Sequence, residues 1–290
     1  MTEDNQNLDG FRHGFTLNNK LQSTGDSDLK AVWSHYVGYR KKKSQIKILE
    51  DEAVRLFVKA TNEYRKSSIK ILESRKNSGQ ENLRSTILEE FFQHLFSDLI
   101  KQKLPTLPNS LYSGCATNSY VSLTFTPKSF TDIFAEPNPY IHTKDQDFVL
   151  GCIIEITVNA KGSESHNRNE VVIPIIAIEC KTYLERNMLD SCAATARRLK
   201  GAMPYCLYIV ASEYLKMEVA QPELTSIDEV FILCKASNGE RLKRVTDNEP
   251  PHEIDPELVV KLFNMIKRHL NSVWWSPEDA LKSGVVINRP

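Results

Sequence analysis

The stretch that decides the fold is Val171-Val-Ile-Pro-Ile-Ile-Ala-Ile-Glu179-Cys-Lys181, an apolar run that ends in a glutamate and a lysine two residues apart. An earlier apolar run opens on an aspartate and reads Asp147-Phe-Val-Leu-Gly-Cys-Ile-Ile-Glu-Ile-Thr-Val158. Residues 159–170 between them are polar and include a glycine, which predicts a β-hairpin with a long loop. Because strand side chains alternate between two faces, Glu179 and Lys181 are expected on the same face of the sheet.

The expected register of this hairpin brings charges together at one end. If Val158 pairs near Val171, counting along both strands places Asp147 level with Thr182, beside the Glu179–Lys181 pair. A register error of about two residues would still leave the three charged groups in one cluster. Two carboxylates beside an ammonium group can hold a divalent metal and activate water, so these three residues are the candidate catalytic group.

Magnesium is the metal that this donor set favours. Mg²⁺ takes oxygen ligands and keeps several of its waters, so two carboxylates and a backbone carbonyl suffice. We expect Asp147, Glu179 and the carbonyl of Cys180 to hold one or two Mg²⁺ ions. In the hydrolysis of a phosphodiester, Lys181 would then orient or help deprotonate the attacking water, or stabilise the pentavalent phosphate. Asp145 is an alternative to Asp147, although it lies farther from the lysine in the expected register.

The rest of the chain surrounds this hairpin with helices. Helical periodicity covers residues of about 29–76 and 82–102. A helix of about 188–200 and a strand of about 205–211 follow the hairpin, and this passage is long enough for a right-handed parallel crossover. We therefore expect an α/β fold of the α+β type, in which a mixed central β-sheet is flanked by helices. Pro174 cannot donate to a strand ladder and is expected at the strand start or at a bulge.

Two regions are predicted along the chain. Residues 1–80 form an N-terminal arm, over about residues 1–28, and a helical region that contacts DNA in one interpretation. Residues 81–290 form the core with C-terminal helices. Within that core, residues 105–145 hold prolines and turn residues and predict a long irregular connection.

The motifs resemble a known group of nucleases. Lys144-Asp-Gln-Asp147-Phe at a strand start and Ile178-Glu179-Cys180-Lys181 at a strand end resemble the PD-(D/E)XK nuclease superfamily, with Gln146 in place of the usual proline. The resemblance implies a restriction-endonuclease-like core and a helical glutamate that extends the metal shell. In Ser85-Thr-Ile-Leu-Glu89-Glu-Phe-Phe, that residue is Glu89, with Glu90 as the alternative.

The phrasing around these motifs is also similar to the Type II restriction endonucleases built from two different but related subunits. Such a resemblance implies a Mg²⁺-dependent, sequence-specific endonuclease of double-stranded DNA in which each subunit cleaves one strand. It further implies a heterodimer with a second related subunit, in preference to a homodimer. The superfamily resemblance covers residues of about 85–235.

Charge provides little global attraction to DNA, because Lys plus Arg and Asp plus Glu number 37 each. Any phosphate-binding surface must therefore come from charge gathered on one face. Two groups of basic residues are candidates for DNA binding, namely Arg40, Lys41, Lys42 and Lys43, and Arg197 and Arg198. A solvated helix face explains the first group equally well.

Other functions and locations follow from the same sequence. The polar, acidic start and the lack of an apolar run of about 18 residues predict a cytoplasmic protein without a membrane span. An E-x-K triplet at a strand end is also common as a solvated ion pair. A repair or mobile-element nuclease with the same site, and a non-catalytic DNA-binding or assembly subunit, are the alternatives.

Overall fold

The computed structural model describes residues 11–74, 83–134, 137–161, 167–272 and 276–284. Its helices are α1 (Arg12–Thr24), α2 (Ser27–Ser44), α3 (Asp51–Ser74), α4 (Ser85–Lys103), α5 (Arg186–Ala202), α6 (Asn238–Thr246), α7 (Pro256–His269) and α8 (Pro277–Ser283), with short 3-10 helices at Asp132–Phe134 and Pro222–Leu224. Its strands are β1 (Leu111–Phe125), β2 (Pro139–Val158), β3 (Asn167–Leu184), β4 (Leu207–Leu215) and β5 (Glu229–Ser237). No helix among these is both long enough and apolar enough to cross a membrane.

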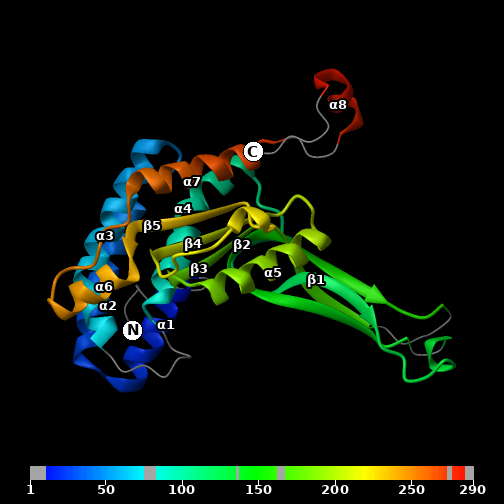
Figure 1. The fold of residues 1–290 in the computed structure, drawn as a ribbon, viewed down its shortest axis with the longest axis horizontal. Coiled ribbons are helices and arrows are strands. Elements are labelled where there is room, and N and C mark those ends of the chain that lie inside the picture. Colours follow the sequence, from blue (N-terminus) through cyan, green and yellow to red (C-terminus); the bar gives the residue numbers. More distant parts are fainter. Residues whose placement is uncertain (1–10, 75–82, 135–136, 162–166, 273–275, 285–290) are drawn as a thin grey trace.

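The strands form one mixed sheet in the order β1-β2-β3-β4-β5. Strands β1, β2 and β3 pair antiparallel, whereas β3, β4 and β5 pair parallel. Helix α5 makes the crossover between β3 and β4, as its position in the sequence predicts. The first three strands extend beyond β4 and β5 in two long hairpins (Figure 1). The predicted mixed sheet with flanking helices is confirmed.

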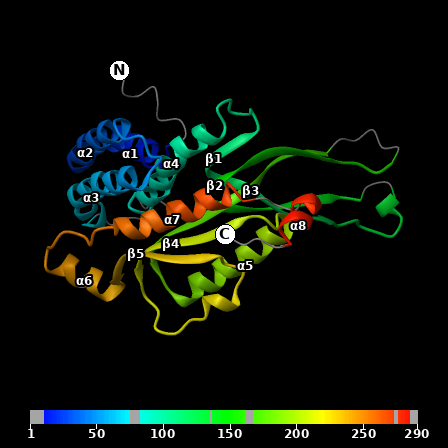
Figure 2. The same ribbon diagram turned by 90° about the horizontal axis from the view of Figure 1, so that it is seen from above.

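Helices cover both faces of the sheet, and the N-terminal helices α1, α2 and α3 lie at one end of it (Figure 2). Helix α5 packs on one face through Leu189, Cys192, Ala196 and Leu199. Helices α4 and α7 share the larger core on the other face with α3. Residues that alternate along β3 divide between these two cores, since Ile178 belongs to the larger one and Ala177 to the smaller.

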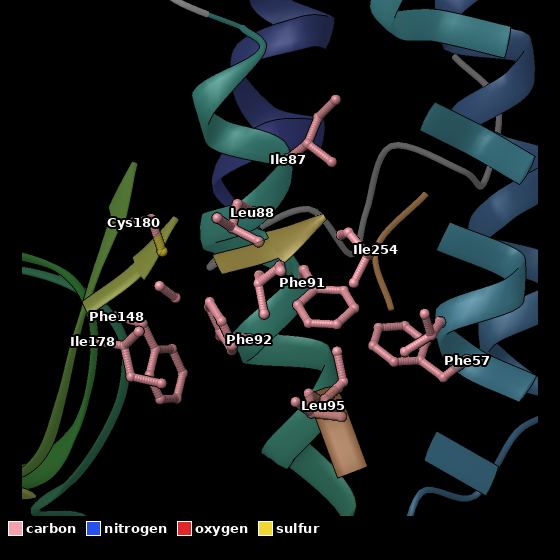
Figure 3. Close-up of a cluster of buried hydrophobic side chains, with 14 of the residues drawn as sticks. Phe57, Ile87, Leu88, Phe91, Phe92, Leu95, Phe148, Ile178, Cys180 and Ile254 are labelled. Carbon is pink, nitrogen blue, oxygen red and sulfur yellow. The ribbon is translucent and has the colours of Figure 1, made fainter. Parts of the chain in front are cut away.

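Helix α4 is the central element of the larger core. Its side chains Leu88, Phe91 and Phe92 lie between Phe57 of α3 and Phe148 of β2 (Figure 3). Burying a large apolar side chain contributes about 1.5–3 kcal/mol. This packing fixes α4 against β2 and β3 and sets the position of Glu89, which follows Leu88.

The register of the β2–β3 hairpin differs from the expected one. Val171 pairs with Ile154 rather than with Val158, because the strands continue into the polar segment as far as the pair Val158 and Asn167. At the other end Phe148 pairs with Ile178, so Asp147 lies next to Glu179 rather than level with Thr182. The three charged residues still lie together, because the difference in register slides one strand along the other by only a few residues and leaves the same strand ends side by side.

Pro174 lies at a bulge, which is one of the two positions predicted for it. The register of β2 and β3 shifts between Leu150 and Gly151, and Gly151 stands opposite Pro174. A β-carbon at Gly151 would overlap the carbonyl of Ile173, so only glycine fits the close approach of the two backbones. The missing N–H of the proline therefore falls where the ladder is already interrupted.

Two sequence predictions about irregular segments were wrong. Residues 12–24 of the predicted arm form helix α1, with Leu17 completely buried, while residues 1–10 lie outside the described residues. The predicted connection 105–145 contains β1 and the start of β2. The sequence shows only short β-prone pieces here, such as residues 120–125, because register shifts at three places along β1 interrupt the alternation of side chains.

The helical prediction for residues 29–76 needs a smaller correction. Helices α2 and α3 share this range, and non-helical residues 45–50 separate them. The boundary predicted between residues 80 and 81 falls in a range that is not described, and it stays a prediction. The larger core nevertheless joins residues of α1, α2 and α3 to the sheet in one cluster.

Candidate active site

Neighbouring strands bring Asp147, Glu179 and Lys181 together. The Lys181 Nζ atom lies 2.5 Å from Glu179 Oε1 and 3.9 Å from Asp147 Oδ2. The backbone N–H of Cys180 donates to Asp147 Oδ2 at 2.7 Å. In a strand, the N–H and C=O of one residue point toward the same neighbour, which places the Cys180 carbonyl on the Asp147 side. The Cys180 side chain itself is buried in the larger core.

Helix α4 adds Glu89 to this cluster. Its carboxylate is buried and pairs with the guanidinium of Arg12, at 2.8 Å between Glu89 Oε2 and Arg12 Nε. Burial raises the pKa of Glu89 to about 7, with a further rise from the charge of Asp147 and a smaller opposing effect of Arg12. The charges of Asp147, Lys181 and Glu179 all act on Glu89, which indicates that Glu89 faces the strand cluster.

Glu90 is bound elsewhere. Its Oε1 atom accepts the Tyr36 hydroxyl at 2.7 Å, and its Oε2 atom accepts the backbone N–H of Gly14 at 2.9 Å. Asp145, the alternative to Asp147, is exposed. The geometry therefore favours Glu89 and Asp147 over the two alternatives.

The charges of the cluster shift one another's protonation. Burial raises the pKa of Asp147, and the Lys181 ammonium opposes this shift. Burial and the nearby Asp147 carboxylate raise the pKa of Glu179. Burial alone would lower the pKa of Lys181, but Glu179 and Asp147 raise it on balance. Lys181 is therefore fully protonated at neutral pH, which suits orientation of water or phosphate better than proton abstraction.

The fit of these residues to a metal depends on their chemistry. Within the described ranges, no three or more His, Cys, Asp or Glu side chains are arranged to hold a metal ion. Salt bridges to Lys181 and Arg12 engage Glu179 and Glu89. The donors are nevertheless all oxygen atoms, as Mg²⁺ requires, and the carboxylates raise one another's pKa, so a cation between them would relieve their repulsion.

Arg12 is a member of the cluster that the sequence pattern did not indicate. Its Nη1 atom lies 2.6 Å from the Cys115 sulfur of β1, and its charge also interacts with Asp147. The polar composition of the N-terminal segment gave no sign of this contact. Only the neighbouring Gly14, a glycine inside a helix, is an unusual local feature.

A buried ionic network supports the strand behind the cluster. Arg84 donates to the Thr182 hydroxyl at 2.7 Å and to Glu213 at 3.0 Å. Arg65 pairs with the same Glu213 carboxylate. Burial would raise the pKa of Glu213, but the two guanidinium groups lower it on balance. This network joins α3 and α4 to β3 and β4 directly after Lys181.

The predicted DNA-binding residues lie in two separate places. On α2, Arg40 stacks over Phe11 at 4.1 Å, Lys42 pairs with Glu63 at 2.5 Å, and Lys43 lies 3.9 Å from Asp98. Partners within the protein thus engage most of this group, and Lys41 is exposed. On α5, Arg197 and Arg198 line an open groove of about 850 Å³ together with Val121, Ser122, His142, Ala194 and Gly201.

Comparison with known proteins identifies the family. Residues 80–286 match the model of the Bpu10I restriction endonuclease family. The chain belongs to this family. Family membership makes it a site-specific deoxyribonuclease of the restriction type, and it confirms the resemblance to restriction endonucleases in the motifs.

Structural comparison agrees with the family assignment. The native BbvCI A2B2 tetramer, solved at low resolution, contains a chain that matches with a TM-score of 0.67 and 20% identity. The match covers 91% of this chain and 96% of the other. At this identity the likeness shows the fold alone. A search of curated proteins found no match.

Proposed function

We propose that this member of the Bpu10I family is a Mg²⁺-dependent endonuclease that recognises a specific sequence in double-stranded DNA and hydrolyses one strand per subunit. The convergence of Asp147, Glu179 and Lys181 at one place on the sheet carries this proposal. Glu89 supports it, because burial and then the nearby Asp147 carboxylate raise its pKa.

The residues divide into two roles. Mg²⁺ would be held by Asp147, Glu179, Glu89 and the carbonyl of Cys180. Lys181 and Arg12 each form a salt bridge to one of these carboxylates, so at least one oxygen of Glu179 and of Glu89 must remain available to the metal. When bound, the metal lowers the pKa of water and stabilises negative charge on the scissile phosphate. The protonated Lys181 orients the attacking water or donates to the phosphate oxygens.

A second subunit and a DNA surface complete the proposal. BbvCI, whose fold is similar, forms an A2B2 tetramer, which supports assembly of this chain with a second, related subunit rather than with itself alone. The groove beside Arg197 and Arg198 would bind the phosphate backbone, with the α2 group Arg40–Lys43 as a second contact.

Plasmid cleavage tests the proposal. Supercoiled plasmid is incubated with Mg²⁺ and the protein, with and without the product of the neighbouring gene. Cleavage into discrete fragments is expected from the mixture, and weak or no nicking from the chain alone. Cutting that depends on branched or damaged DNA would instead indicate a repair nuclease.

Two variants test the site itself. Glu179→Ala and Lys181→Ala are expected to abolish strand cleavage while DNA binding in EDTA survives, because phosphate contacts elsewhere supply most of the affinity. Glu155→Ala, which removes a carboxylate of β2 that pairs with the exposed Arg168, is the matched control and should cleave normally. Full cleavage by Glu179→Ala would remove the basis of the proposal.

A further inference from the structure

Helix α1 is held against α4 by contacts that leave little freedom. His13 is buried, and its ring nitrogens lie 2.8 Å from the Thr86 hydroxyl and 2.5 Å from the Tyr64 hydroxyl. The Gly14 N–H binds Glu90, and a β-carbon at Gly14 would overlap the Tyr36 ring. The residue just before this pair, Arg12, is therefore held beside the candidate active site.

The Arg12 side chain is itself oriented by two partners. Nε contacts Glu89 at 2.8 Å, and Nη1 contacts the Cys115 sulfur at 2.6 Å. Its Nη2 atom forms no hydrogen bond with any residue in the described ranges, and 48% of the side chain is exposed. A guanidinium held through Nε and Nη1 keeps Nη2 in a fixed position, where it is a preorganised donor.

Charge balance indicates what the Nη2 atom can bind. When Glu89, Asp147 and Glu179 are all ionised, as metal ligands must be, they carry three negative charges, and Lys181 and Arg12 carry two positive ones. A bound divalent cation would turn this small negative excess into one net positive charge. Without Arg12 the loaded site would be neutral. A phosphodiester is an anion whose oxygens match the planar donors of arginine.

We propose that Arg12 is a further catalytic residue, which donates from Nη2 to a DNA phosphate at the active site while Nε stays on Glu89. This inference rests on the proposed function of the same site. It also places an active-site residue outside residues 80–286, the range that matches the family model. A phosphate contact from α1 would couple the position of the DNA backbone to the glutamate that helps to hold the metal.

The test measures DNA binding without metal as well as cleavage. A short fluorescent duplex of random sequence is titrated in EDTA at several NaCl concentrations. Arg12→Ala should flatten the dependence of log Kd on log salt by about 0.9, the value for one phosphate contact. Plasmid cleavage by the complex with the partner subunit should fall by about 100-fold, as for loss of one donor to the reacting group.

Two further variants keep the result interpretable. Arg12→Lys retains the charge opposite Glu89 but cannot donate to Glu89 and the phosphate in the same fork geometry, so it should fold normally and still cleave more slowly than the wild type. Lys30→Ala removes one charge from the exposed face of α2 and should keep both the wild-type salt slope and cleavage.

The outcomes separate this inference from the proposed function. If Arg12→Ala or, should that variant fail to fold, Arg12→Lys keeps the wild-type slope and cleavage while Glu179→Ala is inactive, Arg12 is only a counterion of Glu89 and the inference fails. If Glu179→Ala remains active, the proposed site fails regardless of the behaviour of Arg12.

Discussion

Glu89 and Glu90 are neighbours on α4, both are buried, and the protein treats them in opposite ways. Burial and the Asp147 charge raise the pKa of Glu89 to about 7. Burial would also raise the pKa of Glu90, but hydrogen bonds and charge from its partners, His94 first, lower it to about 2. The pKa values differ because the two residues lie on different faces of α4. Glu89 faces the carboxylates of the strand cluster, whereas Glu90 faces hydrogen-bond donors of α1, α2 and α4.

This contrast separates a carboxylate that the fold requires from one that the fold merely tolerates. Glu90 receives the Tyr36 hydroxyl and the Gly14 N–H and joins α1 and α2 to α4. Glu89 forms an ion pair with Arg12, whose side chain is half-exposed. A group kept in an unfavourable electrostatic setting is typical of a functional site. Burial alone would not have told the two apart.

The largest effect is expected from Glu90→Ala. The change leaves the Tyr36 hydroxyl, the Gly14 N–H and His94 without their shared acceptor, and each unsatisfied buried group costs about 1–3 kcal/mol. We expect the free energy of unfolding to fall by about 3–5 kcal/mol in urea denaturation. Glu89→Ala is the matched control and should change it by less than about 1 kcal/mol. Equal losses for the two variants would contradict the contrast.

Glu89→Gln should have the next largest effect, and on cleavage rather than on stability. Removing a carboxylate from the proposed metal shell is expected to slow plasmid cleavage by about 100-fold, equivalent to about 2.7 kcal/mol. The glutamine keeps the side-chain volume, so the unfolding midpoint should not fall. If Glu89→Gln cleaves at the wild-type rate over a range of Mg²⁺ concentrations, Glu89 has no role in metal binding.

The smallest effects concern pH in the metal-free protein. The unfolded chain releases the Glu89 proton near pH 4.5 and the folded chain near 7, so the folded state binds more protons between these values. The contribution of Glu89 to stability therefore falls as pH rises through this window. Glu90 acts in the opposite sense, because its pKa of about 2 makes its contribution fall as pH drops from 4.5 to 2.

Denaturation in EDTA across pH checks these signs. The stability of Glu89→Gln relative to the wild type should increase as pH rises from about 4.5 to 7, while that of Glu90→Gln should decrease as pH rises from about 2 to 4.5. His13, whose pKa burial lowers to about 4, adds its own loss of stability as pH falls from 6.5 in every protein compared. Parallel pH curves for the two variants would reject the assigned shifts.

The parts of the fold that the sequence predicted are those with local patterns. Two apolar runs separated by a polar stretch identified β2 and β3, and their antiparallel pairing brought Asp147 to Glu179 even though the register was wrong. The shift had two local causes, namely strands that extend into a polar segment and a bulge at Pro174. Neither changes which ends of the strands meet, so the candidate site could be predicted without the correct register.

The rest depends on contacts between distant segments. Strand β1 has three register shifts, so its side chains show no steady alternation. Arg12 meets Glu89 across 77 positions of the chain, as the two residue numbers show, and a polar N-terminal segment carries no pattern that specifies such a contact. The choice between Glu89 and Glu90 likewise required knowing which face of α4 meets α1. Sequence periodicity gives the faces of an element but not their partners.

The close fit of Gly14 against Tyr36 has a practical consequence for anyone who shortens this protein. A fragment cut to residues 80–286 would retain every motif of the family match but lose the α1 backbone amide and the α2 hydroxyl that bind Glu90. Such a fragment would expose a carboxylate built for burial, together with the apolar side of α4. We expect this fragment to aggregate on expression, although it contains the whole range of the family match.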